Sequence, residues 1–421
     1  MAISDDVLVI GGGLAGVSSA LAAARRGVRV RLISHKKSTL RNASGLIDLL
    51  GYADGEIVVD PFEAIPALPE GHPYERVGVE GVRESFSLFD EAVGESYLGA
   101  HTDRNALVPT YGGTVKPTAR YPVSTAAGLA SDLRSTLLVG FEGLSAFDAP
   151  LAAQHLRAAG VPFNVRGTSI AFPKRFRSDA TAMRFGRALD RDEPAENGET
   201  HTRRALVERV KDHLDDAERV GFPALLGEDS PEEVRGSLES ALGADVFEVP
   251  MGPPSLPGLR LEDRLYEALD DAGVRVTTGN PVVEFDTEDG RITTVYTDRG
   301  GQRLPFEAKQ VVLATGGLIG KGVQSNREGV YEPVFDCHVS HPEERSEWSR
   351  EGAFDDHPFA RFGLSVDRDM QPLDAEENVE YANLRAAGSV LGGYDLALEK
   401  SGSGVSIATG YAAGRAAGEY A

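Results

Sequence analysis

A strand that runs directly into a glycine-rich turn begins almost at the start of this 421-residue chain. Residues 7–10 are apolar, the Ala-rich stretch 15–24 favours a helix, and a second strand is expected over 28–33. The turn carries its glycines in a Gly-x-Gly-x-x-Gly pattern, at Gly11, Gly13 and Gly16. This context predicts a βαβ unit whose first turn holds a nucleotide phosphate at the amino end of the helix. The alternative is a purely structural tight turn.

The same stretch could be mistaken for a membrane segment, because residues 7–24 carry no charge. Asp5 and Asp6 precede it where a signal peptide would be positively charged, and glycines interrupt it. We therefore expect a soluble chain without a targeting signal.

The composition limits the redox chemistry. Cys337 is the only cysteine, which excludes structural disulfides, thiolate zinc sites and an iron–sulfur cluster held by this chain alone. If the chain handles electrons, it needs an organic cofactor or help from another protein. We expect Cys337 to be a packed, inert thiol.

The net charge of −22 argues against nucleic acid as a partner. The acidic residues are spread along the chain, which favours a solvating surface of the kind found in halophiles over one acidic docking surface.

The order of expected strands, helices and glycine turns predicts an α/β protein with a Rossmann-like FAD/NAD(P)-binding fold and an inserted α+β domain. Prolines crowd 61–73 and a Pro/Gly block covers 250–258, after which strands and glycine turns return. We therefore assign 1–61 and 259–421 to a discontinuous nucleotide-binding domain and 62–258 to an inserted substrate or partner domain. The insertion contains a second strand–turn–helix pattern over 135–159.

Three signals favour flavin over nicotinamide. Dinucleotide sites usually place an acid at the end of the second strand to bind the adenosine ribose, but Ser34, His35, Lys36 and Lys37 stand there. The lysines could instead meet a 2′-phosphate, meet a terminal phosphate without adenosine, or simply be solvated. The second signal is a glycine turn at 314–317 after a buried strand. The third is a helix that Gly402 and Gly404 open, whose positive end could face the flavin pyrimidine.

Blocks along nearly the whole chain resemble the B subunit of the anaerobic glycerol-3-phosphate dehydrogenase, within the fumarate reductase/succinate dehydrogenase flavoprotein superfamily. The matching blocks are 11–16, 44–50, 139–144, 147–148, 253–261, 314–317, 329–333, 388–395 and 402–405. Residues 165–245 depart most from the family pattern. Motifs and resemblance together assign these residues to the cofactor: Gly11, Gly12, Gly13, Leu14, Ala15, Gly16, Ser34, His35, Lys36, Ser44, Gly45, Ala314, Thr315, Gly316, Gly317, Gly388, Ser389, Gly392, Gly393, Gly402, Gly404 and Val405.

The resemblance implies a flavin subunit that uses FMN, with FAD as the alternative. It also implies two partners in the same complex, an FAD-containing catalytic subunit (A) together with an iron–sulfur subunit (C) that passes electrons to membrane quinone. The substrate would be sn-glycerol 3-phosphate, oxidised to dihydroxyacetone phosphate. The chain would be cytoplasmic and reach the inner face of the membrane only through a partner. The missing ribose acid fits FMN, which has no adenosine.

Oxidation of a secondary alcohol needs a proton acceptor, and its phosphate needs cations. The candidate bases are His338, His341 and His357, and the candidate anion ligands are Arg327, Arg345 and Arg361. We predict that Arg327 faces the flavin; the alternative is a surface arginine paired with Glu328 or Glu332. The sequence does not single out one catalytic base. Two other functions stay open, namely a stand-alone FAD oxidoreductase and a structural or electron-relay subunit.

Overall fold

The computed structural model describes residues 2–36, 38–177 and 180–421, and over these residues the chain forms two compact units. Unit 1 comprises Met1–Thr39, Asp48–Gly94 and Arg264–Ala421, and unit 2 comprises Leu40–Ile47 and Glu95–Asp263. Lys37, one of the expected basic pair, lies outside the described residues.

The centre of unit 1 is a parallel sheet built from both ends of the chain. Its parallel strands are β1 (Ile3–Ile10), β2 (Val30–Ser34), β13 (Arg275–Thr278), β16 (Gln302–Leu313) and β21 (Leu384–Ala386). They lie in the order β13-β2-β1-β16, with β21 paired to the carboxyl half of β16. In the register, Val9 of β1 stands between Leu32 and Val312. Strand β1 therefore has a paired strand on either edge, and its carboxyl half, residues 7–10, is buried, which explains the apolar run there.

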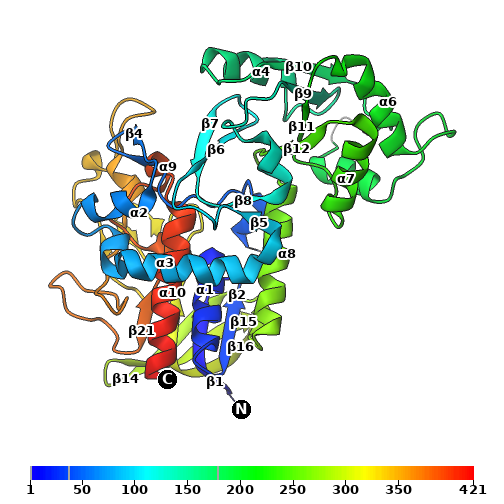
Figure 1. The fold of residues 1–421 in the computed structure, drawn as a ribbon. Helices are drawn as coiled ribbons and strands as arrows, with labels where there is room; N and C mark the ends of the chain where they lie inside the picture. Colours follow the sequence, from blue (N-terminus) through cyan, green and yellow to red (C-terminus); the bar gives the residue numbers. More distant parts are fainter. Residues whose placement is uncertain (1, 37, 178–179) are drawn as a thin grey trace. The chain divides into compact units, whose positions relative to one another are not determined.

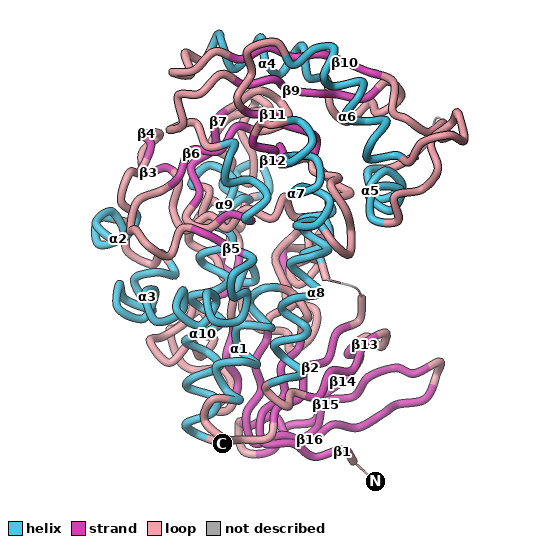
Figure 2. The backbone as a smooth tube through the Cα atoms, turned by 45° about the vertical axis from the view of Figure 1, so that its right-hand side comes forward, coloured by secondary structure: helices cyan, strands magenta, loops and turns pink. Residues whose placement is uncertain are grey.

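An antiparallel hairpin extends this sheet. Strands β14 (Val282–Glu288) and β15 (Arg291–Arg299) pair with one another, and β15 pairs with the amino half of β16 (Figure 2). Asp289 and Gly290 at the tip both have positive φ, as a tight hairpin turn requires. An Asp-Gly pair between two strand-like runs is the usual sequence signature of such a hairpin.

Helices α1 (Leu14–Ala24) and α10 (Gly402–Tyr420) lie side by side on the sheet, and α3 (Pro73–Val93) crosses them (Figure 1). Glycines let α10 approach α1 closely. A Cβ at Gly414 would stand 2.1 Å from the carbonyl oxygen of Ser19, and one at Gly410 would stand 2.4 Å from that of Ala15. The contact is thus backbone against backbone, with small residues on both helices.

Unit 2 contains its own parallel sheet in the order β10-β9-β11-β12. The strands are β9 (Thr136–Phe141), β10 (Val165–Ile170), β11 (Arg219–Pro223) and β12 (Asp245–Val249). The helices around it are α4 (Ala149–Ala158), α5 (Ala182–Asp190), α6 (Thr202–Leu214) and α7 (Pro231–Leu242). Phe141 at the end of β9 packs against Phe172, Phe185 and Phe222, so the carboxyl edge of this sheet is filled by an aromatic core.

The remaining elements are short or connect the units. Helix α8 (Leu256–Asp271) runs from unit 2 into unit 1. The short elements are α2 (Pro61–Ala64), α9 (Leu396–Glu399), β3 (Tyr52–Ala53), β4 (Glu56–Ile57), β5 (Tyr97–Leu98), β6 (Ala106–Pro109), β7 (Val115–Thr118), β8 (Tyr121–Pro122), β17 (Gln324–Ser325), β18 (Val330–Tyr331), β19 (Val339–Ser340) and β20 (Gly363–Leu364). Across the described part of the chain, we find no helix with the length and apolar character needed to span a bilayer.

The predicted α/β flavoprotein fold is confirmed. The main sheet of unit 2 is parallel throughout, where an inserted α+β domain was expected, and the observed unit boundaries also differ from those expected. Residues 62–94 lie in unit 1, because α3 packs on α10. Residues 40–47 lie in unit 2, because Ile47 forms a backbone bridge with Arg120. The assignment of a flavin or substrate role to either domain stays a prediction.

Candidate functional site

The turns singled out in unit 1 meet at one edge of its sheet. Parallel strands end on the same side, and β1, β2, β16 and β21 are immediately followed by such turns. Backbone hydrogen bonds join neighbouring strand ends: Gly11 N donates to Ile33 O and Ala314 N to Ile10 O, both at 2.8 Å. Segments hundreds of residues apart in sequence therefore form one continuous rim.

The first turn shows why its glycines are needed. Gly11 has a φ of +123°, and a Cβ there would stand 2.1 Å from Ala314 O. A Cβ at Gly16 would stand 1.8 Å from Gly11 O. Gly13 differs, because none of the described atoms lies within 4 Å of the position of its missing Cβ. Gly11 and Gly16 thus serve the packing of the turn, whereas Gly13 faces open space.

The amino end of α1 suits an anion. Gly13 is its N-cap, and within the described residues no side chain caps the helix there and the first turn carries no acid. The backbone N–H groups that begin the helix, at Leu14 and Ala15, can therefore bind an exogenous acceptor, and the helix dipole favours a negative charge. This open, uncapped turn fits the phosphate of a flavin nucleotide.

The end of β2 carries hydroxyl groups in place of an acid. Ser34 is buried and its Oγ donates to Lys36 O at 2.7 Å, while His35 and Lys36 are exposed. The hydroxyl of Tyr266, from α8, donates to Gly12 O at 3.1 Å. Tyr266 was not predicted from the sequence, since no motif marks it.

The glycine turn after β16 packs against the segment that follows β21. Gly316 has a φ of +88°, and a Cβ at Gly317 would stand 2.4 Å from Ser389 O. Gly317 N also donates to Ser389 Oγ at 3.0 Å. The Thr315 hydroxyl is buried and has no hydrogen-bond partner among the residues described.

The segment 388–393 connects this rim to a cavity. Gly388 has a φ of +80°, and its missing Cβ would stand 2.6 Å from the Cβ of Ala15 in α1. At the other end, Gly392 and Gly393 line the cavity. A short stretch of backbone thus contacts helix α1 at one end and borders the cavity at the other.

The glycines that open α10 have a packing role. A Cβ at Gly404 would stand 2.1 Å from the Tyr74 hydroxyl oxygen and 2.7 Å from Leu49 Cα, and Gly404 N donates to Asp48 O. Val405 is fully buried, and a Cβ at Gly402 would contact Leu396. This packing alone explains the Gly-x-Gly pattern, and the contact of these residues with a flavin stays a prediction.

Ser44 and Gly45 belong to unit 2. Gly45 has a φ of +84°, and its missing Cβ would stand 2.6 Å from Pro257 Cβ, while Ser44 Oγ accepts from Leu46 N. Their assignment to the cofactor also stays a prediction.

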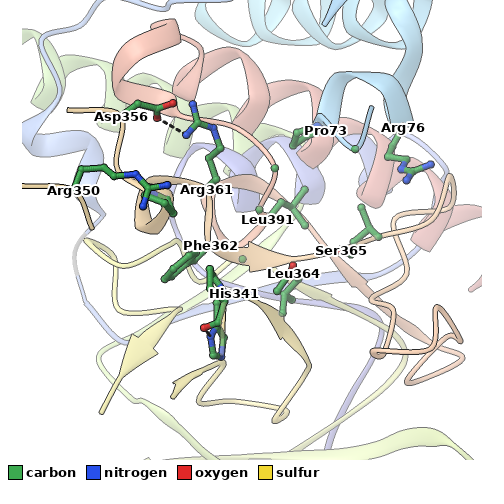
Figure 3. A pocket seen from close by; sticks show the side chains of 18 residues that line it. Pro73, Arg76, His341, Arg350, Asp356, Arg361, Phe362, Leu364, Ser365 and Leu391 are labelled. Atoms are coloured by element: carbon green, nitrogen blue, oxygen red, sulfur yellow. Dashed lines mark hydrogen bonds and ion pairs between the residues drawn. The ribbon is translucent and has the colours of Figure 1, made fainter. Parts of the chain in front are cut away.

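This cavity, one of several in unit 1, has a volume of about 580 Å³ and a basic lining. Arg350 and Arg361 lie on one side of it and Arg76 on the other (Figure 3). Arg361 donates to Asp356, and this hydrogen bond raises the pKa of Arg361. Among the described residues, neither Arg76 nor Arg350 forms an ion pair, so the cavity keeps a positive charge in a protein of net charge −22.

His341 lines the same cavity and is held by backbone on both sides of its ring. Its Nδ1 lies 2.8 Å from Pro342 O, and Val330 N donates to Nε2 over a long 3.4 Å. Since the carbonyl can only accept, Nδ1 carries the proton and Nε2 is the basic atom. Trp348 and Phe362 pack edge-on and tilted against the ring.

The structure brings together two of the candidate residues, His341 and Arg361, and does not place the others in this cavity. Arg327 is exposed and away from the lining, so its predicted position toward the flavin gains no support. Its suggested partner Glu332 is buried and accepts from Val334 N and Phe335 N instead.

The other candidates lie elsewhere. His338 lines a separate cavity, Arg345 lies over the Trp348 ring, and His357 stacks on Phe359. Arg76 and Arg350 were not predicted from the sequence, because they lie in no recognisable motif.

Comparison with known proteins gives the family. The model of the FAD binding domain matches residues 6–405. A probable B subunit of anaerobic glycerol-3-phosphate dehydrogenase from Halobacterium salinarum is 59% identical over 424 residues, covering 100% of this chain and 99% of the relative. This chain belongs to the family of anaerobic glycerol-3-phosphate dehydrogenase B subunits. The corresponding protein of Vibrio cholerae is 31% identical, and the match covers 96% of this chain and 94% of the relative.

Family membership confirms the predicted resemblance, the flavoprotein oxidoreductase class and the halophile-like character of the composition. Among solved structures, the 3-ketosteroid delta1-dehydrogenase of Sterolibacterium denitrificans has a TM-score of 0.47 at 11% identity, covering 99% of both chains. E. coli quinol fumarate reductase FrdA has a TM-score of 0.42 at 10% identity, covering 100% of this chain and 71% of its own.

Proposed function

We propose that this chain is the flavin-binding subunit of a respiratory glycerol-3-phosphate dehydrogenase and that the basic cavity binds sn-glycerol 3-phosphate. The observation that carries the proposal is the segment 388–393, which touches α1 at Gly388 and borders the cavity at Gly392 and Gly393. A cofactor with its phosphate at α1 and a substrate in the cavity would thus lie at the two ends of the same short segment.

The cavity lining suits a phosphorylated alcohol. Guanidinium groups are preferred ligands of phosphate, and Arg76, Arg350 and Arg361 offer them around one space. His341 Nε2 is the group proposed to accept the hydroxyl proton as the alcohol becomes a ketone, with the substrate hydroxyl replacing the long contact from Val330 N. A bound flavin supplies the two-electron acceptor for this oxidation. The product would be dihydroxyacetone phosphate.

We further propose FMN as the cofactor, with FAD as the alternative, because Ser34 stands where a ribose-binding acid is usual. Two further proteins, an FAD-containing catalytic subunit (A) together with an iron–sulfur subunit (C), would complete the complex. The lone Cys337 supports this division, since a cluster would need cysteines from another chain. Electrons would pass to quinone, and the chain would meet the cytoplasmic face of the membrane through a partner.

The substrate site is tested by Arg350→Ala in the purified complex. We expect the KM for glycerol 3-phosphate to rise about tenfold or more, because one charge-assisted hydrogen bond to phosphate is lost. Arg204→Ala, on the exposed surface of α6, removes the same charge from a residue that does not line the cavity and is the matched control. An unchanged KM in Arg350→Ala would contradict the assignment of the cavity.

A separate measurement tests whether the protein is redox-active. The purified chain should be yellow and release flavin on denaturation. Colourless protein that FMN and FAD fail to reconstitute would support a structural role. Turnover by the chain alone with an artificial acceptor would support a stand-alone oxidoreductase.

A further inference from the structure

We propose that Tyr266, together with Ser34, closes the place that dinucleotide-binding folds use for the adenosine ribose, so that the site selects a flavin monophosphate over a flavin dinucleotide. The inference rests on the proposed flavin site and adds a specificity-determining residue to it.

The relevant place lies at the carboxyl end of β2, beside the first glycine turn. In dinucleotide-binding folds, an acid at this strand end binds the ribose hydroxyls and the pyrophosphate lies at the helix amino end. Here Ser34 ends the strand, and its hydroxyl is already engaged with Lys36 O at 2.7 Å. A carboxylate that could hold a ribose is absent from 34–37 in the sequence.

The Tyr266 hydroxyl fills the space in front of Gly12. It donates to Gly12 O at 3.1 Å, and a Cβ at Gly12 would stand only 2.4 Å from its oxygen. The same Cβ would stand 3.0 Å from Ser34 Oγ. The turn, the strand end and the phenol are therefore packed closely together at Gly12, where not even a methyl group could be added.

Helix α8 holds the phenol in this position. Leu265 and Leu269, one turn apart, are buried and fix the carboxyl half of the helix, and Tyr266 is half-buried beside them. Because the ring is anchored by the helix and its hydroxyl by Gly12 O, displacing it would break a hydrogen bond and disturb apolar packing.

The two flavins make different demands on this region. FMN ends at its phosphate, which needs only Gly13 and the free N–H groups of α1. FAD continues into a second phosphate and an adenosine, whose ribose would have to reach the end of β2. There it would meet the Tyr266 phenol and no carboxylate. The free space at Gly13 and the filled space at Gly12 thus favour FMN over the longer FAD.

The test compares the dissociation constants of FMN and FAD for the full-length chain, measured by flavin fluorescence. We expect wild-type protein to prefer FMN. In Tyr266→Ala, the ratio of the FAD to the FMN dissociation constant should fall about tenfold, which equals ~1.4 kcal/mol. Adding Ser34→Glu should lower it further, because a carboxylate can then bind the ribose hydroxyls. Tyr266→Phe keeps the ring and should keep most of the preference.

Tyr296→Ala is the matched control, because Tyr296 is also half-buried in unit 1 and bonds Asp286 on the hairpin. Unchanged FMN affinity in Tyr296→Ala, with an unchanged circular dichroism spectrum in every variant, shows that the fold is intact. If wild type prefers FMN and Tyr266→Ala leaves the ratio unchanged, the role of Tyr266 is refuted while the FMN assignment stands. If wild type prefers FAD, the FMN assignment and this inference both fail.

Discussion

Cys337 is buried among acidic neighbours, which determines its reactivity. Its side chain is 3% exposed, and burial, together with Glu380 and Glu332, raises the pKa of its thiol well above the ordinary value. The thiolate is the reactive form, so the native thiol has neither the charge state nor the exposure for attack. The structure thus agrees with the inert thiol expected from the sequence.

We therefore predict that a thiol reagent such as DTNB labels the native protein slowly at pH 7 and remains slow at pH 9. An exposed thiol, with a pKa of about 8.5, would instead react roughly tenfold to a hundredfold faster over that interval. In denaturant the single thiol of each chain should react at once. Fast native labelling that follows pH like a free thiol would contradict the buried position.

Single residues were predictable where a local pattern specifies them. Gly11, Gly13 and Gly16 could be identified because a strand, a turn and a helix follow one another within a few residues. Arg76, Arg350 and Tyr266 could not, because their roles depend on distant segments meeting in space. Arg76 in particular lies in the first turn of α3, before a non-helical residue, Gly78, with a φ of +74°.

The packing of α10 on α1 depends on glycines, whose lack of a side chain lets the two helix backbones approach. Gly410, Gly414 and Gly418 recur every four residues and face α1. At sequence level, a glycine-rich helix start next to a flavin fold suggested a cofactor contact at Gly402 and Gly404. Sequence cannot distinguish a glycine that admits a ligand from one that admits a neighbouring helix, since both need only the absence of a Cβ.

We predict that Gly414→Val destabilises the protein by about 2–4 kcal/mol, because the added atoms would overlap the Ser19 backbone and force the helices apart. Denaturant unfolding in concentrated salt measures the loss. Gly236→Val in α7 is the control, since a Cβ there meets none of the described atoms within 4 Å. Equal losses in both variants would indicate an effect of helix propensity and not of packing.

For the whole molecule, the net charge of −22 is the dominant electrostatic term. Self-repulsion of so many carboxylates opposes a compact state, and salt screens it with a Debye length of about 3 Å at 1 M. We predict that the melting temperature rises steadily from dilute to molar KCl, on the order of ten degrees or more. A melting temperature independent of KCl would show that ion pairs already balance the repulsion.

The architecture was largely predictable, but the division into units was not. The βαβ start, the late strand and the hairpin follow from local apolar patterns and turn residues. The boundaries at 40–47 and 62–94 depend on which unit each segment packs against, and composition carries no such information. The proline-rich stretch near residue 61 marks a change in composition, but the chain stays in unit 1 there.

The pairing of β1 with β16 has a consequence for synthesis of the chain. Ile3 is hydrogen-bonded into the sheet opposite Phe306, so the first strand leaves the ribosome long before its neighbour exists. Nearly all of unit 2, Glu95–Asp263, emerges in the interval and has its own parallel sheet and core. Unit 2 can therefore fold while β1 still has no partner strand at the edge that later pairs with β16. We expect chaperones to bind the nascent amino-terminal segment during this interval.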